Sequence, residues 1–267
     1  MGFWESFLIL FAISCLVCLS GFYKYLYFIS VGYGFSVAAI GIALFVLFYD
    51  KLNLATVILS VILVVYGVRL GGYLLLRDVK SDTYKKAMKK EFKEELDTKI
   101  FPKICTWLSC ALLYVLQTMP VLCVLVKGDG AKLITYVGAL ISVAGIIIES
   151  VADAQKTKFK KENPTKFCNR GLYRIVRCPN YFGEILVWTG IFVSGIASFE
   201  GVIQWALAIL GYVCIVYIMF GGARRLELRQ DKNYGDDEEY LEYARKKPII
   251  LPLVPIYSVK KHKWLIG

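Results

Sequence analysis

Residues 54–76 read LATVILSVILVVYGVRLGGYLLL, an apolar run in which Arg69 is the one charged residue. A helix needs about 20 consecutive apolar residues to cross the hydrocarbon core of a bilayer. Six further windows have similar length and composition: 7–22, 25–49, 104–126, 133–152, 181–199 and 201–223. The sequence therefore predicts an all-α integral membrane protein, a bundle of seven transmembrane helices that forms a single membrane domain over residues 1–267.

The overall composition supports this interpretation. Of the 267 residues, 57% are apolar and 20% are charged, and the mean hydropathy is +0.57. Soluble domains are about 45–50% apolar, so the composition argues against a soluble globule and against a disordered chain. The chain has one His, and Cys15 and Cys18 have no second pair at metal-ligand spacing. We therefore expect no metal site.

The positive charges predict how the helices are oriented. Of the 32 Lys and Arg residues, 28 lie at Lys24 or in the segments 77–103, 153–177 and 222–267. With seven spans these four segments all fall on one face of the membrane, and the positive-inside rule makes that face cytosolic. The N-terminus is then predicted to lie outside and the segment after the seventh span in the cytosol.

The net charge of +11 does not predict a nucleic-acid partner. Topology and contact with anionic membrane lipids account for it. The Lys residues of 85–99 alternate with the acids Glu91, Glu94, Glu95 and Asp97, which is typical of a solvated helix with pairs such as Glu95–Lys99.

Three ionisable residues fall within the spans: Arg69, Glu149 and Glu184. Charged groups in hydrocarbon are costly and usually face the interior of the bundle, where they pair, reach toward the interface or mark a site. Tyr66, Arg69 and Tyr73 follow i, i+3, i+7 spacing and share one helical stripe. The stripe either packs or presents hydrogen-bond donors to a buried ligand oxygen. Gly67-x-x-x-Gly71 on the same helix predicts close helix packing.

A polar cluster opens the sixth span. Gly171 and Pro179 shape a turn there, and Asn180 and Glu184 are four residues apart, so they share a helix face. Cations and acids flank this turn at the ends of three helices, at Glu149, Asp153, Lys156, Lys160, Arg170, Arg174, Arg177, Arg224, Arg225 and Arg229. Such a cationic face is suited to a phosphate-bearing cofactor, although the chain lacks a Rossmann glycine fingerprint and a phosphate-binding loop.

These motifs resemble the steroid 5-alpha-reductase superfamily, in particular its broad branch of uncharacterised members. The similarity rests on Gly171-Leu-Tyr-Arg174, Arg177-Cys-Pro-Asn-Tyr-Phe-Gly-Glu184 and Trp188-x-Gly190. It extends over residues 60–255 through the segments Tyr66-Gly-Val-Arg69, Tyr114-Val-Leu-Gln117, Glu149-x-x-x-Asp153-x-Gln155, Tyr234-Gly, Tyr240-x-x-Tyr243 and Pro248-x-x-x-Pro252. That superfamily has seven helices, which agrees with the number of spans derived above.

The resemblance implies NADPH-dependent reduction of a carbon–carbon double bond conjugated to a carbonyl in a lipid-soluble substrate. By this resemblance Tyr66 hydrogen-bonds the substrate carbonyl and Glu184 joins it as a catalytic residue. The substrate-binding residues are then Arg69, Tyr73 and Gln117. The cofactor-binding residues are Asn180, Asp153, Lys160, Lys166, Arg174, Arg177, Arg224 and Arg225. The resemblance also favours the endoplasmic reticulum membrane.

Two departures from the family pattern stand out. The second span contains no acid where the family has a second carbonyl-binding Glu, so Tyr27 or Tyr33 is a candidate substitute. Cys178 replaces the usual His and could be a thiol at the mouth of the site.

Two alternatives have other functions. Isoprenylcysteine carboxyl methyltransferases have a related turn and bind S-adenosylmethionine, but Asn180, Asp153 and Tyr66 favour the reductase. A non-catalytic member that binds only a lipid or a partner protein is the other alternative. The sequence makes no prediction of the oligomeric state.

Overall fold

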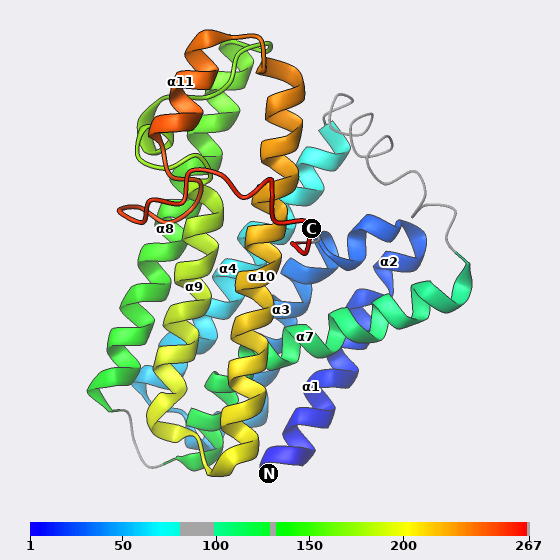
Figure 1. Ribbon diagram of the computed structural model, residues 1–267. Coiled ribbons are helices and arrows are strands. Elements are labelled where there is room, and N and C mark those ends of the chain that lie inside the picture. The colour runs from blue at the N-terminus through cyan, green and yellow to red at the C-terminus, as the bar shows by residue number, and fades with distance from the viewer. Residues whose placement is uncertain (81–98, 129–131, 266–267) are drawn as a thin grey trace. The chain divides into compact units, whose positions relative to one another are not determined.

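The computed structural model describes residues 1–80, 99–128 and 132–265, which form helices and turns without a strand (Figure 1). Seven helices in these ranges are long and apolar enough to cross a membrane: Phe3–Tyr23, Tyr25–Leu47, Leu54–Lys80, Ile100–Lys127, Leu133–Glu162, Pro179–Ser198 and Gly201–Tyr234. The predictions of an all-α fold and of seven spans are confirmed. The expected solvated helix over 85–99 lies almost wholly outside the described residues.

The described residues group into two compact units. Unit 1 comprises Met1–Ala139 and Ile191–Gly211, and unit 2 comprises Leu140–Gly190 and Tyr212–Gly267. Three long helices pass from one unit to the other. A single membrane domain over the whole chain stays a prediction.

Unit 1 is built around a close pair of helices. Its elements are α1 (Phe3–Cys18), α2 (Ser20–Tyr23), η1 (Tyr25–Phe28), α3 (Val31–Leu47), η2 (Tyr49–Lys51), α4 (Leu54–Lys80), α7 (Ile100–Lys127) and η4 (Ile196–Ser198). In α3 and α4 a Cβ atom added to Gly34 would lie 2.3 Å from the backbone N of Gly71, and one added to Gly67 would lie 2.4 Å from the carbonyl of Gly34. The close packing predicted from Gly67-x-x-x-Gly71 is therefore confirmed.

A polar contact fixes the turn before α3. The Lys24 ammonium pairs with the Asp78 carboxylate, and the Tyr27 hydroxyl donates to the other Asp78 oxygen at 2.8 Å. Asp78 is buried near the end of α4. Lys24 thus has a partner inside the protein besides its predicted contribution to topology.

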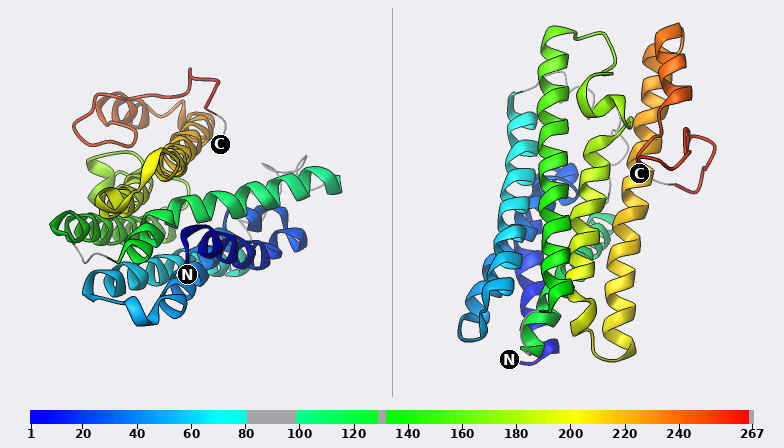
Figure 2. Two further views of the ribbon diagram at one scale, coloured as in Figure 1. Left: turned by 90° about the horizontal axis from the view of Figure 1, so that it is seen from below. Right: turned by 90° about the vertical axis from the view of Figure 1, so that its left-hand side faces the viewer.

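Unit 2 holds most of α8 (Leu133–Glu162), α9 (Pro179–Gly195) and α10 (Gly201–Tyr234), with η3 (Gly171–Arg174) and α11 (Glu238–Lys246). Within this unit α9 lies between α8 and α10 (Figures 1 and 2). The Ser142 hydroxyl of α8 donates to the Val187 carbonyl of α9 at 2.9 Å. A Cβ atom on Gly183 would lie 2.7 Å from the backbone N of Glu149. Helices α8 and α9 are therefore in backbone contact beside the polar cluster.

The chain after α10 returns to the start of α9. Asp237 caps α11 by accepting hydrogen bonds from the backbone N–H groups of Glu239 and Tyr240. Beyond α11 the carbonyls of Pro248 and Ile249 accept hydrogen bonds from the backbone N–H groups of Arg177 and Cys178, at 2.9 and 2.8 Å. This segment fixes the backbone immediately before α9.

Candidate functional site

The turn that precedes α9 is anchored to α8 by one glutamine. Gln155 Oε1 accepts a hydrogen bond from the Leu172 N–H at 2.9 Å. Gly171 beside it has φ +58°, and a Cβ atom at this position would lie 2.3 Å from Gln155 Oε1. Both the positive φ and the close approach require glycine here. The sequence Gly171-Leu-Tyr-Arg174 therefore forms a turn of fixed shape.

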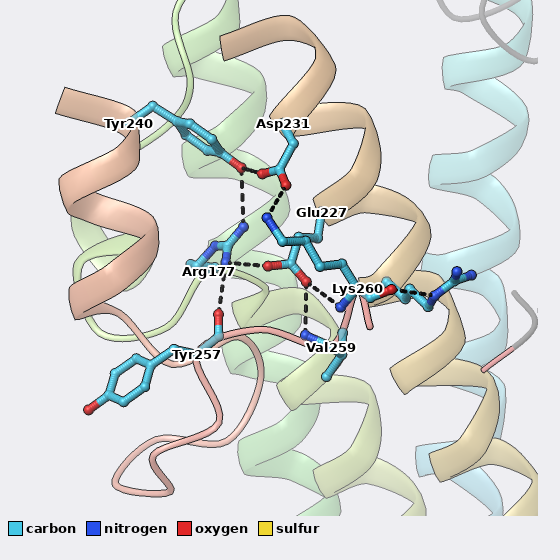
Figure 3. Close-up of polar contacts among 8 residues, drawn as sticks. Arg177, Glu227, Asp231, Tyr240, Tyr257, Val259 and Lys260 are labelled. Atoms are coloured by element: carbon cyan, nitrogen blue, oxygen red, sulfur yellow. Dashed lines mark hydrogen bonds and ion pairs between the residues drawn. The ribbon is translucent and has the colours of Figure 1, made fainter. Parts of the chain in front are cut away.

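Arg177 is the centre of a buried network (Figure 3). Its side chain is 1% exposed, and its Nη1 donates to Glu227 Oε1 and to the Tyr257 carbonyl, each at 3.0 Å. Its Nη2 donates to the Tyr240 hydroxyl at 3.3 Å. Burial by itself would lower the pKa of Arg177, but the Glu227 carboxylate and the Tyr240 phenol more than offset it and raise the pKa above its ordinary value. Arg177 is therefore charged and paired with Glu227.

The same network fastens the segment after α11 to α10. Glu227 Oε2 accepts hydrogen bonds from the backbone N–H groups of Val259 and Lys260, at 2.9 and 3.0 Å. The Lys260 ammonium lies 2.7 Å from Asp231 Oδ2, and the Tyr240 hydroxyl donates to Asp231 Oδ1 at 2.7 Å (Figure 3). Burial and the hydrogen bond to Asp231 raise the pKa of Tyr240, so its phenol stays a donor.

This arrangement differs from the expectation for Arg177. The sequence predicts a cation for a cofactor phosphate, whereas the structure pairs the guanidinium with a carboxylate on α10. Sequence reasoning did not identify Glu227 or Asp231. The available signal was that Glu227 and Asp231 follow Arg224 at helical spacing in a segment that is rich in cations. Acids placed among cations are candidates for buried partners.

Two other residues that were predicted to bind the cofactor through their positive charge also form hydrogen bonds within the protein. The Lys160 ammonium donates to the Pro164 carbonyl at 3.3 Å and to the Tyr234 hydroxyl at 2.8 Å. Arg224 donates through Nε to the Lys260 carbonyl at 3.2 Å and through Nη1 to the Leu265 carbonyl at 3.3 Å. These cations therefore help to hold the loops in place.

The remaining predicted cations differ in exposure. Lys166 and Arg174 are exposed to solvent, and Arg225 is half-buried on α10. Arg174 is the last residue of η3, which Gln155 fixes, and Lys166 lies in the segment before it. Lys166 and Arg174 are thus the predicted cations whose exposure best suits a phosphate arriving from water.

The acids and the amide of the cluster lie deeper. Glu149 and Asp153 on α8 and Glu184 on α9 are all buried. Asn180, in the first turn of α9, is half-buried, and its Oδ1 atom is buried without a hydrogen bond among the described residues. A buried acceptor of this kind is uncommon in native structures. It is suited to a ligand that donates a hydrogen bond.

Cys178 is not a thiol at the mouth of the site, as the sequence suggested it could be. Its side chain is buried, and burial raises the pKa of the thiol to about 11. Because the thiolate is the reactive form, Cys178 is a packing residue at neutral pH.

In unit 1 the side chain of Tyr66, the predicted catalytic residue, is positioned by other tyrosines. Tyr66 on α4 is 0% exposed, and its hydroxyl lies 3.2 Å from the hydroxyl of Tyr33 on α3. The Tyr33 ring stacks on Tyr114 of α7 with centroids 4.8 Å apart. The Tyr114 hydroxyl is itself fixed, because it donates to the Phe28 carbonyl at 2.6 Å. Three helices therefore position the Tyr33–Tyr66 pair.

The predicted substrate-binding residues take different positions in unit 1. The Tyr73 ring contacts two cations, with the Arg69 and Arg77 guanidinium carbons 5.9 and 5.4 Å from its centroid. Gln117 on α7 is 4% exposed. The structure thus places Tyr66, Tyr73, Arg69 and Gln117 in unit 1 and the predicted cofactor-binding residues in unit 2.

Comparison with known proteins identifies the family. Residues 17–247 match the family described as "Protein of unknown function (DUF1295)". A segment of 78 residues is 30% identical to the steroid 5-alpha-reductase DET2 of Arabidopsis thaliana, covering 28% of this chain and 26% of that protein. The match thus spans about a quarter of the plant protein's length, and no solved structure matches. Together these findings are consistent with the steroid reductase superfamily, and the chain belongs to the DUF1295 family.

Proposed function

We propose that the protein is a membrane-embedded, NADPH-dependent reductase of a carbon–carbon double bond conjugated to a carbonyl in a lipid. The family and the similarity to a plant protein named as a steroid 5-alpha-reductase support a membrane reductase-like protein. The assignment of NADPH as cofactor and of an enone lipid as substrate rests on individual residues of the chain. The similarity to the reductase superfamily further favours the endoplasmic reticulum membrane, with the cofactor bound from the cytosol.

The buried Asn180 Oδ1 is the observation that carries the cofactor assignment. This acceptor has no hydrogen bond among the described residues, and leaving such an atom buried costs about 1–3 kcal/mol. The carboxamide of a nicotinamide ring carries an N–H donor that would satisfy it. Asn180 would thus hold the nicotinamide, with Asp153 of α8, also in unit 2, as a further contact. Lys166 and Arg174 would meet the phosphates from water.

Tyr66 would act on the substrate. Its hydroxyl donates a hydrogen bond to the substrate carbonyl oxygen, which draws electrons from the conjugated double bond and makes the β-carbon electrophilic. When bound, NADPH supplies the hydride that this carbon accepts. Negative charge then develops on the carbonyl oxygen, where Tyr66 stabilises it, and a proton from the medium at the α-carbon completes the saturated bond.

A thermal-shift titration of the detergent-purified protein tests the cofactor. We expect NADPH to raise the unfolding temperature with concentration, because a ligand that binds only the folded state stabilises it. NADH and S-adenosylmethionine are titrated in parallel. A response to S-adenosylmethionine in place of NADPH would favour methyl transfer, and a response to none of the three would favour a non-catalytic lipid-binding protein.

A pair of variants locates the cofactor. Asn180→Ala is expected to weaken the NADPH response while leaving the unfolding temperature without ligand close to that of the wild type. Asn233→Ala is the matched control, because Asn233 is exposed near the end of α10. An undiminished NADPH response in Asn180→Ala would show that Asn180 does not hold the cofactor.

A further inference from the structure

Gln117 is a buried polar residue of α7 that lacks the hydrogen bonds its polar neighbour has. It is 4% exposed, and neither its amide oxygen nor its amide nitrogen has a hydrogen bond to any described residue. Its neighbour Thr118 is different, because the Thr118 hydroxyl donates to the Tyr114 and Val115 carbonyls at 2.9 and 3.1 Å. The Thr118 hydroxyl is therefore hydrogen-bonded within α7, whereas the amide oxygen and the amide nitrogen of Gln117 both lack a hydrogen bond among the described residues.

An open buried amide is costly for the folded protein. It loses its hydrogen bonds to water and gains none in return. Every residue from Tyr114 to Leu125 is buried, so Gln117 faces the protein interior and not the surrounding lipid. A residue with this cost and no structural partner is explained by a ligand that supplies the missing hydrogen bonds.

The position of Gln117 points to the same ligand as Tyr66. Gln117 lies one helical turn after Tyr114, so the two side chains share a face of α7, about 4.5 Å apart along the axis. Tyr114 stacks on Tyr33, whose hydroxyl meets the hydroxyl of Tyr66. The open amide is thus one turn along α7 from the aromatic group that positions the proposed carbonyl donor.

The chemistry of the amide selects the ligand group. The amide offers two N–H donors and one oxygen acceptor. A carboxylate would satisfy only the nitrogen and an ammonium only the oxygen, whereas a hydroxyl both accepts and donates. We propose that Gln117 binds a hydroxyl group on the substrate, at a position apart from the enone, so that the preferred substrates are hydroxylated and uncharged. This proposal rests on the function proposed above.

The test combines stability and binding. Gln117→Leu replaces the open amide by an apolar side chain and is expected to raise the unfolding temperature of the ligand-free protein. Gln155→Leu is the matched control. It makes the same change where the amide oxygen accepts the Leu172 N–H, and it is expected to lower the unfolding temperature.

Binding is measured by thermal shift with two steroid enones as probes, one with a ring hydroxyl remote from the enone and its deoxy counterpart. Wild-type protein is expected to bind the hydroxylated probe more tightly. In Gln117→Leu that preference should disappear, with about tenfold weaker binding of the hydroxylated probe, as for the loss of one hydrogen bond.

Three outcomes overturn the proposal: a less stable Gln117→Leu protein, an unchanged preference in the variant, or wild-type protein that does not prefer the hydroxylated probe. Since these measurements use no cofactor, failure of the reductase assignment would be seen separately, as the absence of a response to NADPH.

Discussion

Arg177 illustrates how a single charge is used in this protein. Its type and position are evident in the sequence, but Arg177 lies in the turn before α9 and its partner Glu227 is 50 residues further along the chain, on α10. Sequence spacing relates residues on one helix and carries no information about pairs between distant segments. The sequence therefore predicts that the candidate site is positively charged. It does not predict which of these cations pair with groups of the protein and which are left for a ligand.

Substitution of Arg177 tests the buried network. Arg177→Leu leaves the Glu227 carboxylate buried without its cation, and we expect a loss of about 3–5 kcal/mol in the free energy of unfolding. Chemical denaturation of the detergent-solubilised protein measures it. Lys246→Leu is the control. It removes the exposed pair with Glu242 four residues earlier and should have no measurable effect. Equal losses in the two variants would contradict the network described here.

The phenol of Tyr66 is tested by removing one oxygen atom. Tyr66→Phe keeps the ring and its packing but loses the donor to the substrate carbonyl. We expect kcat for reduction of an enone lipid to fall by about 10²–10³, with the thermal response to NADPH unchanged. Tyr49→Phe, at a residue that is 76% exposed, should leave kcat at the wild-type value. A normal rate in Tyr66→Phe would assign the carbonyl to another donor.

At the scale of helices, the prediction from sequence is accurate within the membrane and incomplete outside it. The windows 133–152 and 201–223 locate α8 and α10, but these helices continue to Glu162 and Tyr234. An apolar run marks the part of a helix that meets lipid, and its polar continuation has no such signal. The turn before α9 was predicted from Gly171 and Pro179, because glycine permits backbone angles that other residues avoid and proline favours the first position of a helix.

The contact of α8 with α9 depends on a glycine. Gly183→Ala would place a methyl group 2.7 Å from the backbone N of Glu149, which has no freedom to move aside. We expect a loss of about 1–3 kcal/mol in the free energy of unfolding. Gly72→Ala on α4 makes the same change where nothing lies within 4 Å, and should stabilise by up to about 1 kcal/mol. Effects of the same sign at both positions would argue against close helix contact at Gly183.

For the whole chain, the distribution of Lys and Arg makes a prediction about orientation. Seven spans place the ends of the chain on opposite sides of the membrane, and the positive-inside rule places residues 222–267 in the cytosol. Protease added to sealed microsomes should remove a tag placed after Gly267 and spare one placed before Met1. Vesicles opened with detergent should lose both tags. Removal of the tag before Met1 from sealed vesicles, with the tag after Gly267 spared, would show the opposite orientation.

The hydrogen bonds that the carbonyls of Pro248 and Ile249 accept from the backbone before α9 have a consequence for biosynthesis. A ribosome makes the sixth and seventh spans before it makes residues 248–260, and domains generally fold in the order of synthesis. The turn that leads into α9, where Asn180 lies, therefore stays unfinished until the following segment emerges and bonds to Arg177, Cys178 and Glu227. A premature stop codon after the seventh span would yield a chain with every span inserted and this turn incomplete. Cellular quality control would meet such a chain as a folding defect outside the membrane and not as a failure of membrane insertion.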